Sequence, residues 1–239
     1  MVYSFLLIGL IIFFAAFVQS FSGFGFALIS IPLLTFFFDI KTAVPLGALF
    51  GLIINILLVI KLKEEINFKK IKNLYIGALF GIPLGIWVFV FVNASILKYA
   101  VAIIIIVFVF NAFIKILKPQ KLNPFWGYIT GLISGILGGA LNINGPPVLI
   151  YFYFVSSNKT ELKSSISGYF IVTSIIIVTT HLISGITSTF IILNFLYFLP
   201  FLFLGFYLGI SLFNKVKTEI FNKIVLFILM IIATLLFFN

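Results

Sequence analysis

The chain has 239 residues, of which 63% are hydrophobic and 8% are charged, and its formal net charge is +10. So few polar residues cannot cover a water-soluble globule, and the composition therefore predicts an integral membrane protein. Every basic residue is a lysine, and the lysines cluster in short segments between apolar runs, which indicates membrane topology and argues against nucleic-acid binding.

The first half of the chain is predicted to begin with a helical hairpin over residues 3–38. Glycines and small polar residues separate its two apolar runs, 3–19 and 24–38. The second run is too short to cross a hydrocarbon core about 30 Å thick, so we expect a broken or re-entrant helix. Three runs of spanning length follow, and they lie at 42–61, 73–92 and 96–116.

The second half shows the same order of elements. A hairpin predicted over 124–156 contains the apolar runs 124–138 and 146–156, and three runs of spanning length follow at 164–184, 190–213 and 220–238. The halves also resemble each other in sequence, since Gly81 and Gly85 fall against Gly205 and Gly209. We therefore expect an all-α polytopic membrane protein with a first repeat over 1–118 and a second repeat over 119–239, each a hairpin plus three transmembrane helices.

The lysines predict how these elements are oriented. Four lysine-rich loops fall on the cytoplasmic side if each hairpin enters and leaves the membrane on the same side, which leaves only Lys41 and Lys98 outside. The two halves then cross the membrane in opposite directions, as an inverted repeat. We expect a multi-pass protein of the cell membrane with both termini outside the cytoplasm.

Each hairpin is interrupted by residues that suit an anion. Backbone can leave the helix at membrane depth only where it is buried in protein or lines a cavity, so a matched pair of breaks predicts a binding site. The helix start after each break carries free N–H groups and a partial positive charge. The alternative is that the polar side chains only satisfy backbone freed by the breaks. We expect the breaks to face each other and to bind substrate through Gln19, Ser20, Ser22, Gly23, Gly25, Asn142, Asn144, Gly145 and Pro146.

Four segments resemble the TauE/SafE family of membrane transporters, which is named for sulfite export: 22–26, 31–34, 41–44 and 145–149. The most specific part is the Gly145-Pro146-Pro147 sequence at the end of the second hairpin. The resemblance covers nearly the whole chain. It implies a secondary transporter of small anions, often sulfur oxyanions or organosulfonates.

Other polar residues within the predicted spans are few. His181 is the only histidine and a candidate for proton coupling, but its place near the outer end of its span favours an interfacial role. Asn55 and Asn111 are expected to form interhelical hydrogen bonds. Glycines spaced four residues apart, at 77–85 and 127–139, are expected to allow close helix packing.

Three functions are compatible with these features. We favour a secondary transporter that alternates between inward-open and outward-open states around a site at the membrane midplane. An anion channel of the same architecture is the first alternative. A membrane-embedded enzyme is less favoured, because one histidine, no cysteine and no intramembrane carboxylate cannot supply a catalytic set. We expect no cofactor and no metal; the expected partners are a small anionic substrate and membrane lipid, and a homo-oligomer is left open.

Overall fold

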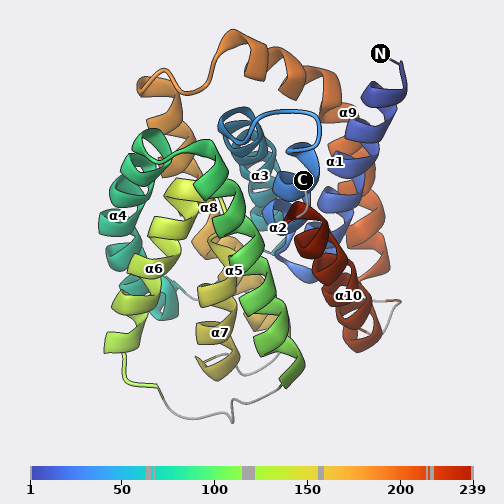
Figure 1. Ribbon diagram of the computed structural model, residues 1–239. Helices are drawn as coiled ribbons and strands as arrows, with labels where there is room; N and C mark the ends of the chain where they lie inside the picture. Colours follow the sequence, from blue (N-terminus) through green and yellow to red (C-terminus); the bar gives the residue numbers. More distant parts are fainter. Residues whose placement is uncertain are drawn as a thin grey trace. The chain divides into compact units, whose positions relative to one another are not determined.

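The structure, a computed structural model, describes residues 2–62, 66, 68–114, 122–155, 159–213, 215 and 218–237. Within these residues it contains ten α-helices and no strand (Figure 1). The prediction of an all-α protein is therefore confirmed. The helices are α1 (Val2–Ser22), α2 (Phe26–Leu34), α3 (Ile40–Leu62), α4 (Phe68–Phe91), α5 (Ala94–Ile114), α6 (Phe125–Leu141), α7 (Gly145–Val155), α8 (Lys159–Ile183), α9 (Thr189–Leu212) and α10 (Thr218–Phe237).

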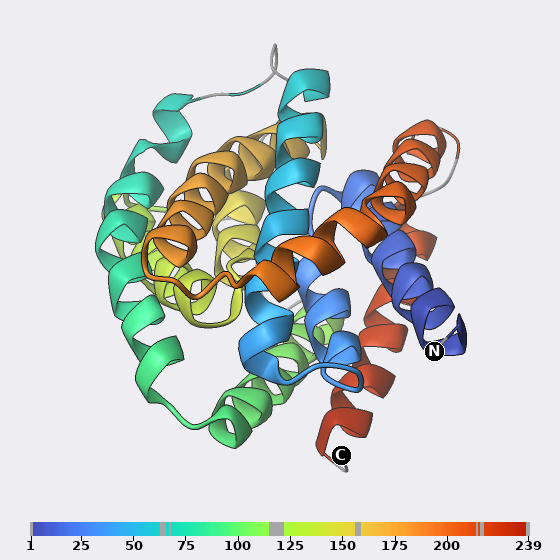
Figure 2. The same cartoon turned by 90° about the horizontal axis from the view of Figure 1, so that it is seen from above.

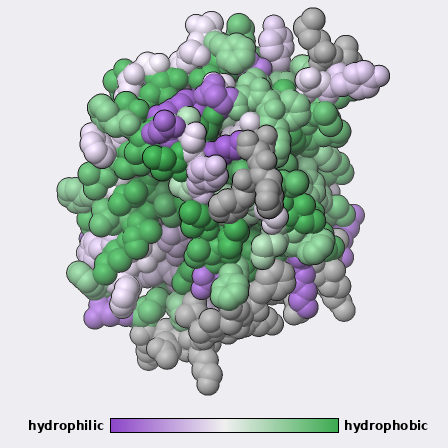
Figure 3. Space-filling view, in the orientation of Figure 1, coloured by the Kyte–Doolittle hydropathy of each residue, from purple (hydrophilic) through white to green (hydrophobic). Residues whose placement is uncertain are grey.

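Six helices of the described chain are long and apolar enough to cross a membrane, namely α1, α3, α4, α5, α8 and α9. The helices α6 and α7 are shorter, as is the apolar stretch Lys223–Leu236 of α10. Apolar side chains also cover much of the face drawn in Figure 3. Trp87, for example, is 60% exposed, as expected for a side chain in contact with lipid. The fold is that of a multi-pass membrane protein.

The first hairpin differs from its prediction in the lengths of its helices. α1 continues to Ser22, three residues beyond the predicted end at residue 19, and is long enough to cross a membrane by itself. Ser20 and Ser22 lie within the helix, and their hydroxyls donate to the main-chain oxygens of Ala16 and Val18 one turn earlier. α2 ends at Leu34, and residues 35–38 form turns.

The helices form two compact units that do not follow the two halves of the chain. Unit 1 consists of Met1–Phe50, Asn93–Ile116 and Thr187–Asn239, and unit 2 of Gly51–Val92 and Leu117–Ile186. Unit 1 therefore combines α1, α2 and α5 with α9 and α10 from the second half. Unit 2 combines α4 with α6, α7 and α8. The chain passes from unit 1 to unit 2 within α3.

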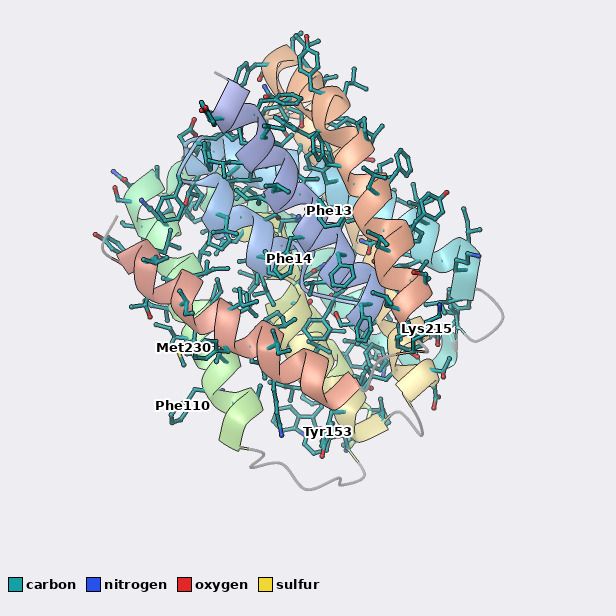
Figure 4. The ribbon with its side chains drawn as sticks, turned by 90° about the vertical axis from the view of Figure 1, so that its right-hand side faces the viewer. Phe13, Phe14, Phe110, Tyr153, Lys215 and Met230 are labelled. Atoms are coloured by element: carbon teal, nitrogen blue, oxygen red, sulfur yellow. The ribbon has the colours of Figure 1, made fainter. Side chains whose placement is uncertain are left out.

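In unit 1, α1 packs against α9, and α5 packs against α10 (Figures 1 and 2). A Cβ atom on Gly205 of α9 would meet the main-chain oxygen of Phe13, so the missing side chain lets the two backbones approach closely. Figure 4 shows Phe110 of α5 and Met230 of α10 on the other helix pair. Both pairs join a helix of the first half to a helix of the second half.

In unit 2, α4 and α6 pack through the two predicted glycine faces. A Cβ on Gly81 would meet the main-chain oxygen of Leu132, and a Cβ on Gly135 would lie 2.9 Å from the Cα of Ala78. Backbone atoms on each helix thus occupy the space that a side chain on the other would need. The prediction that these glycines allow close packing is confirmed. α8 packs against α4 and α7.

Candidate functional site

The first break lies between α1 and α2 and contains residues 23–25. Gly23 has φ 88° and Gly25 has φ 108°, in the left-handed region that L side chains rarely adopt. Both glycines are buried. In Figure 1, α1 begins and α2 ends at the same end of unit 1. The break therefore reverses the direction of the chain, as expected for a helical hairpin.

The start of α2 presents main-chain donors at this break. The first main-chain hydrogen bond of α2 runs from the Ile29 N–H to the main-chain oxygen of Gly25, at 3.2 Å. The N–H groups of residues 26–28 therefore have no main-chain acceptor within the helix. Gln19 accepts from the Phe26 N–H through Oε1 at 3.1 Å. The Gln19 side chain, which is 5% exposed, thus caps α2 from across the break. The N–H groups of Ala27 and Leu28 also lie before the first helical hydrogen bond, and the partial positive charge of the helix start favours an anion beside them.

The two serines of the first hairpin bond to backbone. The Ser22 hydroxyl lies 2.7 Å from each of two main-chain oxygens, those of Val18 and Phe24. The Ser20 hydroxyl donates to Ala16 and Phe17 and lies 3.5 Å from the main-chain oxygen of Gly205, so it faces α9. A hydroxyl has one proton, and in both serines it is directed to a carbonyl. Both hydroxyls thus bond to backbone, and their contact with a substrate stays a prediction.

The second break lies between α6 and α7, in unit 2, and contains residues 142–144. Asn142 has φ 56° and is the only non-glycine residue with positive φ in the described chain. Asparagine tolerates this conformation better than most side chains. The two breaks have the same length, and each begins with a left-handed residue, Gly23 in one and Asn142 in the other. Figure 1 shows that α6 begins and α7 ends at the same end of unit 2.

The two asparagines of the second break differ in their contacts. Asn144 donates through Nδ2 to Thr173 Oγ1 of α8 at 3.1 Å, and its main-chain oxygen accepts from the Ser134 hydroxyl at 2.7 Å. The side chain of Asn142 is 9% exposed and makes no hydrogen bond among the described residues. Asn142 is therefore the one amide at either break that is available to a ligand.

Gly145 and Pro146 form the buried start of α7. Pro146 and Pro147 have no N–H, so two of the donors that a helix start normally presents do not exist here. The remaining main-chain donors at this end are those of Asn144 and Gly145. Over its first three residues α7 thus keeps one main-chain N–H, that of Gly145, where α2 has three, and the second break adds the Asn142 amide.

His181 lies near the end of α8, but its side chain is 1% exposed and stacks on Phe89 of α4 with ring centroids 5.8 Å apart. The side chain is therefore covered by α4, and its expected position near the membrane interface stays a prediction. Neither ring nitrogen has a hydrogen-bond partner in the described chain. The described residues also contain no cluster of three potential metal ligands.

The predicted interhelical hydrogen bonds of Asn55 and Asn111 have different outcomes. Asn55 of α3 donates to Ser174 Oγ of α8 at 3.3 Å, which confirms the predicted interhelical bond. Asn111 instead donates to the main-chain oxygen of Val107 on its own helix at 2.7 Å, so the prediction for Asn111 is wrong. Its side chain is exposed, and the carbonyl one turn earlier is its nearest acceptor.

Two polar residues that contact the second break, and a third that contacts one of them, were not predicted. Ser134 and Thr173 bond to Asn144, and the Tyr169 hydroxyl donates to Ser134 Oγ at 2.9 Å. One signal was present in the sequence, since Tyr169 and Thr173 lie four residues apart and so share a face of α8. That face packs against α6 and α7.

Comparison with known proteins adds three findings. A family model described as "Sulfite exporter TauE/SafE" matches residues 8–236. A protein of Cupriavidus necator described as "Probable sulfite/organosulfonate exporter TauE" is 24% identical over 115 residues, which cover 46% of this chain and 45% of that protein. The match to this relative therefore spans a little under half of each protein. No solved structure matches the chain significantly.

Proposed function

Because the chain belongs to the sulfite exporter TauE/SafE family, we propose that it is a secondary membrane transporter of small sulfur-containing anions, such as sulfite or an organosulfonate. The family match covers nearly the whole chain, from residue 8 to residue 236. The Cupriavidus necator relative, a probable sulfite/organosulfonate exporter, supports the same substrate class.

The observation that carries the proposal is the pair of equal breaks. Each contains three residues, begins with a left-handed residue and is followed by a short helix, α2 or α7. Broken helices of this kind bind anionic groups in transporters, because their helix starts are the positive ends of helix dipoles. In this proposal the N–H groups of Ala27 and Leu28 are the principal donors at the first break, and the Asn142 amide is the principal donor at the second.

The donor set favours an anion with several oxygen acceptors. The chain contains no arginine, and the groups available at the breaks are neutral amides and main-chain N–H groups. A sulfite or sulfonate group presents three oxygens that can accept from such donors. Amide donors hold the anion without a permanent ion pair, which suits a carrier that must also release it.

We further propose the inverted-repeat topology, with both termini outside the cytoplasm. Helix packing supports the repeat, because α1 with α9 and α6 with α4 would be equivalent pairs in its two halves, and both pairs pack closely. Glycines lie at the contact in each pair. The placement of the termini is supported by the lysine distribution alone. Alternating access around the breaks, proton coupling through His181 and the facing arrangement of the two breaks stay predictions.

The proposal can be tested by uptake of radiolabelled sulfite into proteoliposomes that contain the purified protein. We expect saturable uptake that depends on a gradient of protons or of a counter-ion, and competition by organosulfonates. Flux that rises linearly with sulfite concentration would favour the anion channel instead. If neither sulfite nor any sulfonate crosses, the proposed substrate class is wrong.

A further inference from the structure

Four residues beside the second break form a closed circuit of hydrogen bonds within unit 2. The Ser134 hydroxyl donates to the main-chain oxygen of Asn144 at 2.7 Å, and the Tyr169 hydroxyl donates to Ser134 Oγ at 2.9 Å. The Thr173 hydroxyl donates to the main-chain oxygen of Tyr169 at 3.1 Å and accepts from Asn144 Nδ2 at 3.1 Å. The circuit runs from Asn144 through Thr173, Tyr169 and Ser134 back to Asn144.

The bonds in this circuit have one consistent direction. The single proton of the Thr173 hydroxyl is directed to the main-chain oxygens of Tyr169 and Phe170, so Thr173 Oγ1 accepts from Asn144. Asn144 must therefore present its amide nitrogen to α8. The bonds form two consecutive pairs, one through Thr173 and one through Ser134, and within each pair the two bonds polarise and strengthen each other.

Burial makes each member of the circuit difficult to replace. Ser134 and Tyr169 are fully buried, and Thr173 is 1% exposed. Removing the Thr173 hydroxyl leaves Asn144 Nδ2 without its acceptor in an apolar interior. Removing the Tyr169 hydroxyl takes away the bond that Ser134 Oγ accepts, and so loosens the hydroxyl that holds the main-chain oxygen of Asn144. A substitution at Tyr169 should therefore affect Asn144, with Ser134 as the link between them.

We infer that Tyr169, Ser134 and Thr173 are positioning residues that hold the second break in the geometry that binds the anion. The inference rests on the proposed function. Asn144 is held through its main-chain oxygen and its amide nitrogen, while the neighbouring amide of Asn142 has no bond among the described residues. The circuit thus fixes the backbone, and Asn142 contacts the anion. A break whose backbone is already ordered before binding loses less conformational entropy when the anion binds.

Two substitutions test the circuit, and two others serve as matched controls. Tyr169→Phe and Thr173→Val each remove one hydroxyl and keep the side-chain shape. Thr173→Ser keeps the hydroxyl. Tyr75→Phe removes a phenol whose ring stacks on Tyr169 with centroids 5.9 Å apart but whose hydroxyl donates to the main-chain oxygen of Gly168, outside the circuit.

The first measurement is sulfite uptake into proteoliposomes. We expect the apparent KM to rise about three- to tenfold in Tyr169→Phe and Thr173→Val, with the maximal rate within about twofold of wild type, as for the loss of one hydrogen bond. Thr173→Ser and Tyr75→Phe should keep the wild-type KM. A general loss of folded protein would lower the maximal rate and leave KM unchanged.

The second measurement needs no substrate. Hydrogen–deuterium exchange of the main-chain amides at 142–145 should be faster in Tyr169→Phe and Thr173→Val than in wild type and Tyr75→Phe, while exchange elsewhere is unchanged. If wild-type protein transports no sulfur anion, the proposed function is wrong, but this exchange still tests the circuit. The inference is overturned if Tyr169→Phe matches Tyr75→Phe in exchange at 142–145, or if exchange rises equally throughout the protein.

Discussion

Asn142 combines a backbone conformation that few side chains adopt with an amide that is unbound among the described residues. Glycine would adopt φ 56° more easily, and glycine occupies the equivalent first position of the other break at Gly23. The turn alone therefore does not require an asparagine rather than a glycine, although asparagine tolerates this conformation. The proposed binding of an anion gives its amide a role.

Substitution of Asn142 by glycine and by alanine separates these two roles. Both variants lose the amide, so we expect each to raise the KM for sulfite uptake about tenfold or more, because hydrogen bonds to charged groups are worth about 1.5–3 kcal/mol. Only Asn142→Ala should also lower the free energy of unfolding, by about 1 kcal/mol, since alanine is strained at positive φ. Thermal unfolding in detergent measures the second effect. A wild-type KM in Asn142→Gly would remove the amide from the anion site.

The helices on either side of the breaks show which features the sequence could predict. Both breaks were predicted because glycine, asparagine and proline act locally on the backbone. The end of α1 was not predicted, because the helix continues through polar residues as far as Ser22, beyond the apolar run that marks it in the sequence. The circuit around Asn144 could not be predicted either, since Ser134 and Tyr169 lie 35 residues apart and meet only when α6 packs against α8.

The contact between α4 and α6 leads to a prediction about stability. A Cβ on Gly81 would meet the main-chain oxygen of Leu132 and lie 3.0 Å from Gly135 Cα, and neither backbone atom can rotate away. We expect Gly81→Ala to destabilise the protein by about 1–3 kcal/mol, the usual range for overpacking. The measurement is the melting temperature in detergent.

Gly185 provides the control for this prediction. It has φ 68°, and a Cβ there would meet nothing within 4 Å. Gly185→Asn should therefore change the melting temperature little, because asparagine tolerates this conformation. Equal melting temperatures for Gly81→Ala and wild type would contradict the close packing of α4 on α6.

At the scale of the whole molecule, each compact unit contains helices from both halves of the chain. α9 packs on α1, and α4 packs on α6, so neither half forms a compact unit alone. Hydrophobic patterns predict which segments are helices, but they do not predict which helices pair. The lysines allowed the orientation of the helices in the membrane to be predicted as well. Lysine-rich loops favour the cytoplasmic side, whichever helices pack together.

The predicted orientation can be tested by labelling single cysteines, because the chain has none of its own. Ser188 precedes α9 and Lys215 follows it, and both side chains are exposed (Figure 4 labels Lys215). We expect a membrane-impermeant thiol reagent added to intact cells to label Ser188→Cys and not Lys215→Cys. Permeabilised cells should show labelling of both variants. The reverse pattern in intact cells would place the termini in the cytoplasm.

The most direct test of the account is equilibrium binding of sulfite to the purified protein, measured by calorimetry in wild type and Asn142→Gly. The account predicts saturable binding to wild type, competition by organosulfonates, and affinity about tenfold or more weaker in the variant. Equal affinity in both proteins, or no binding of sulfite or any sulfonate to wild type, would contradict the claim that the helix breaks bind the anion.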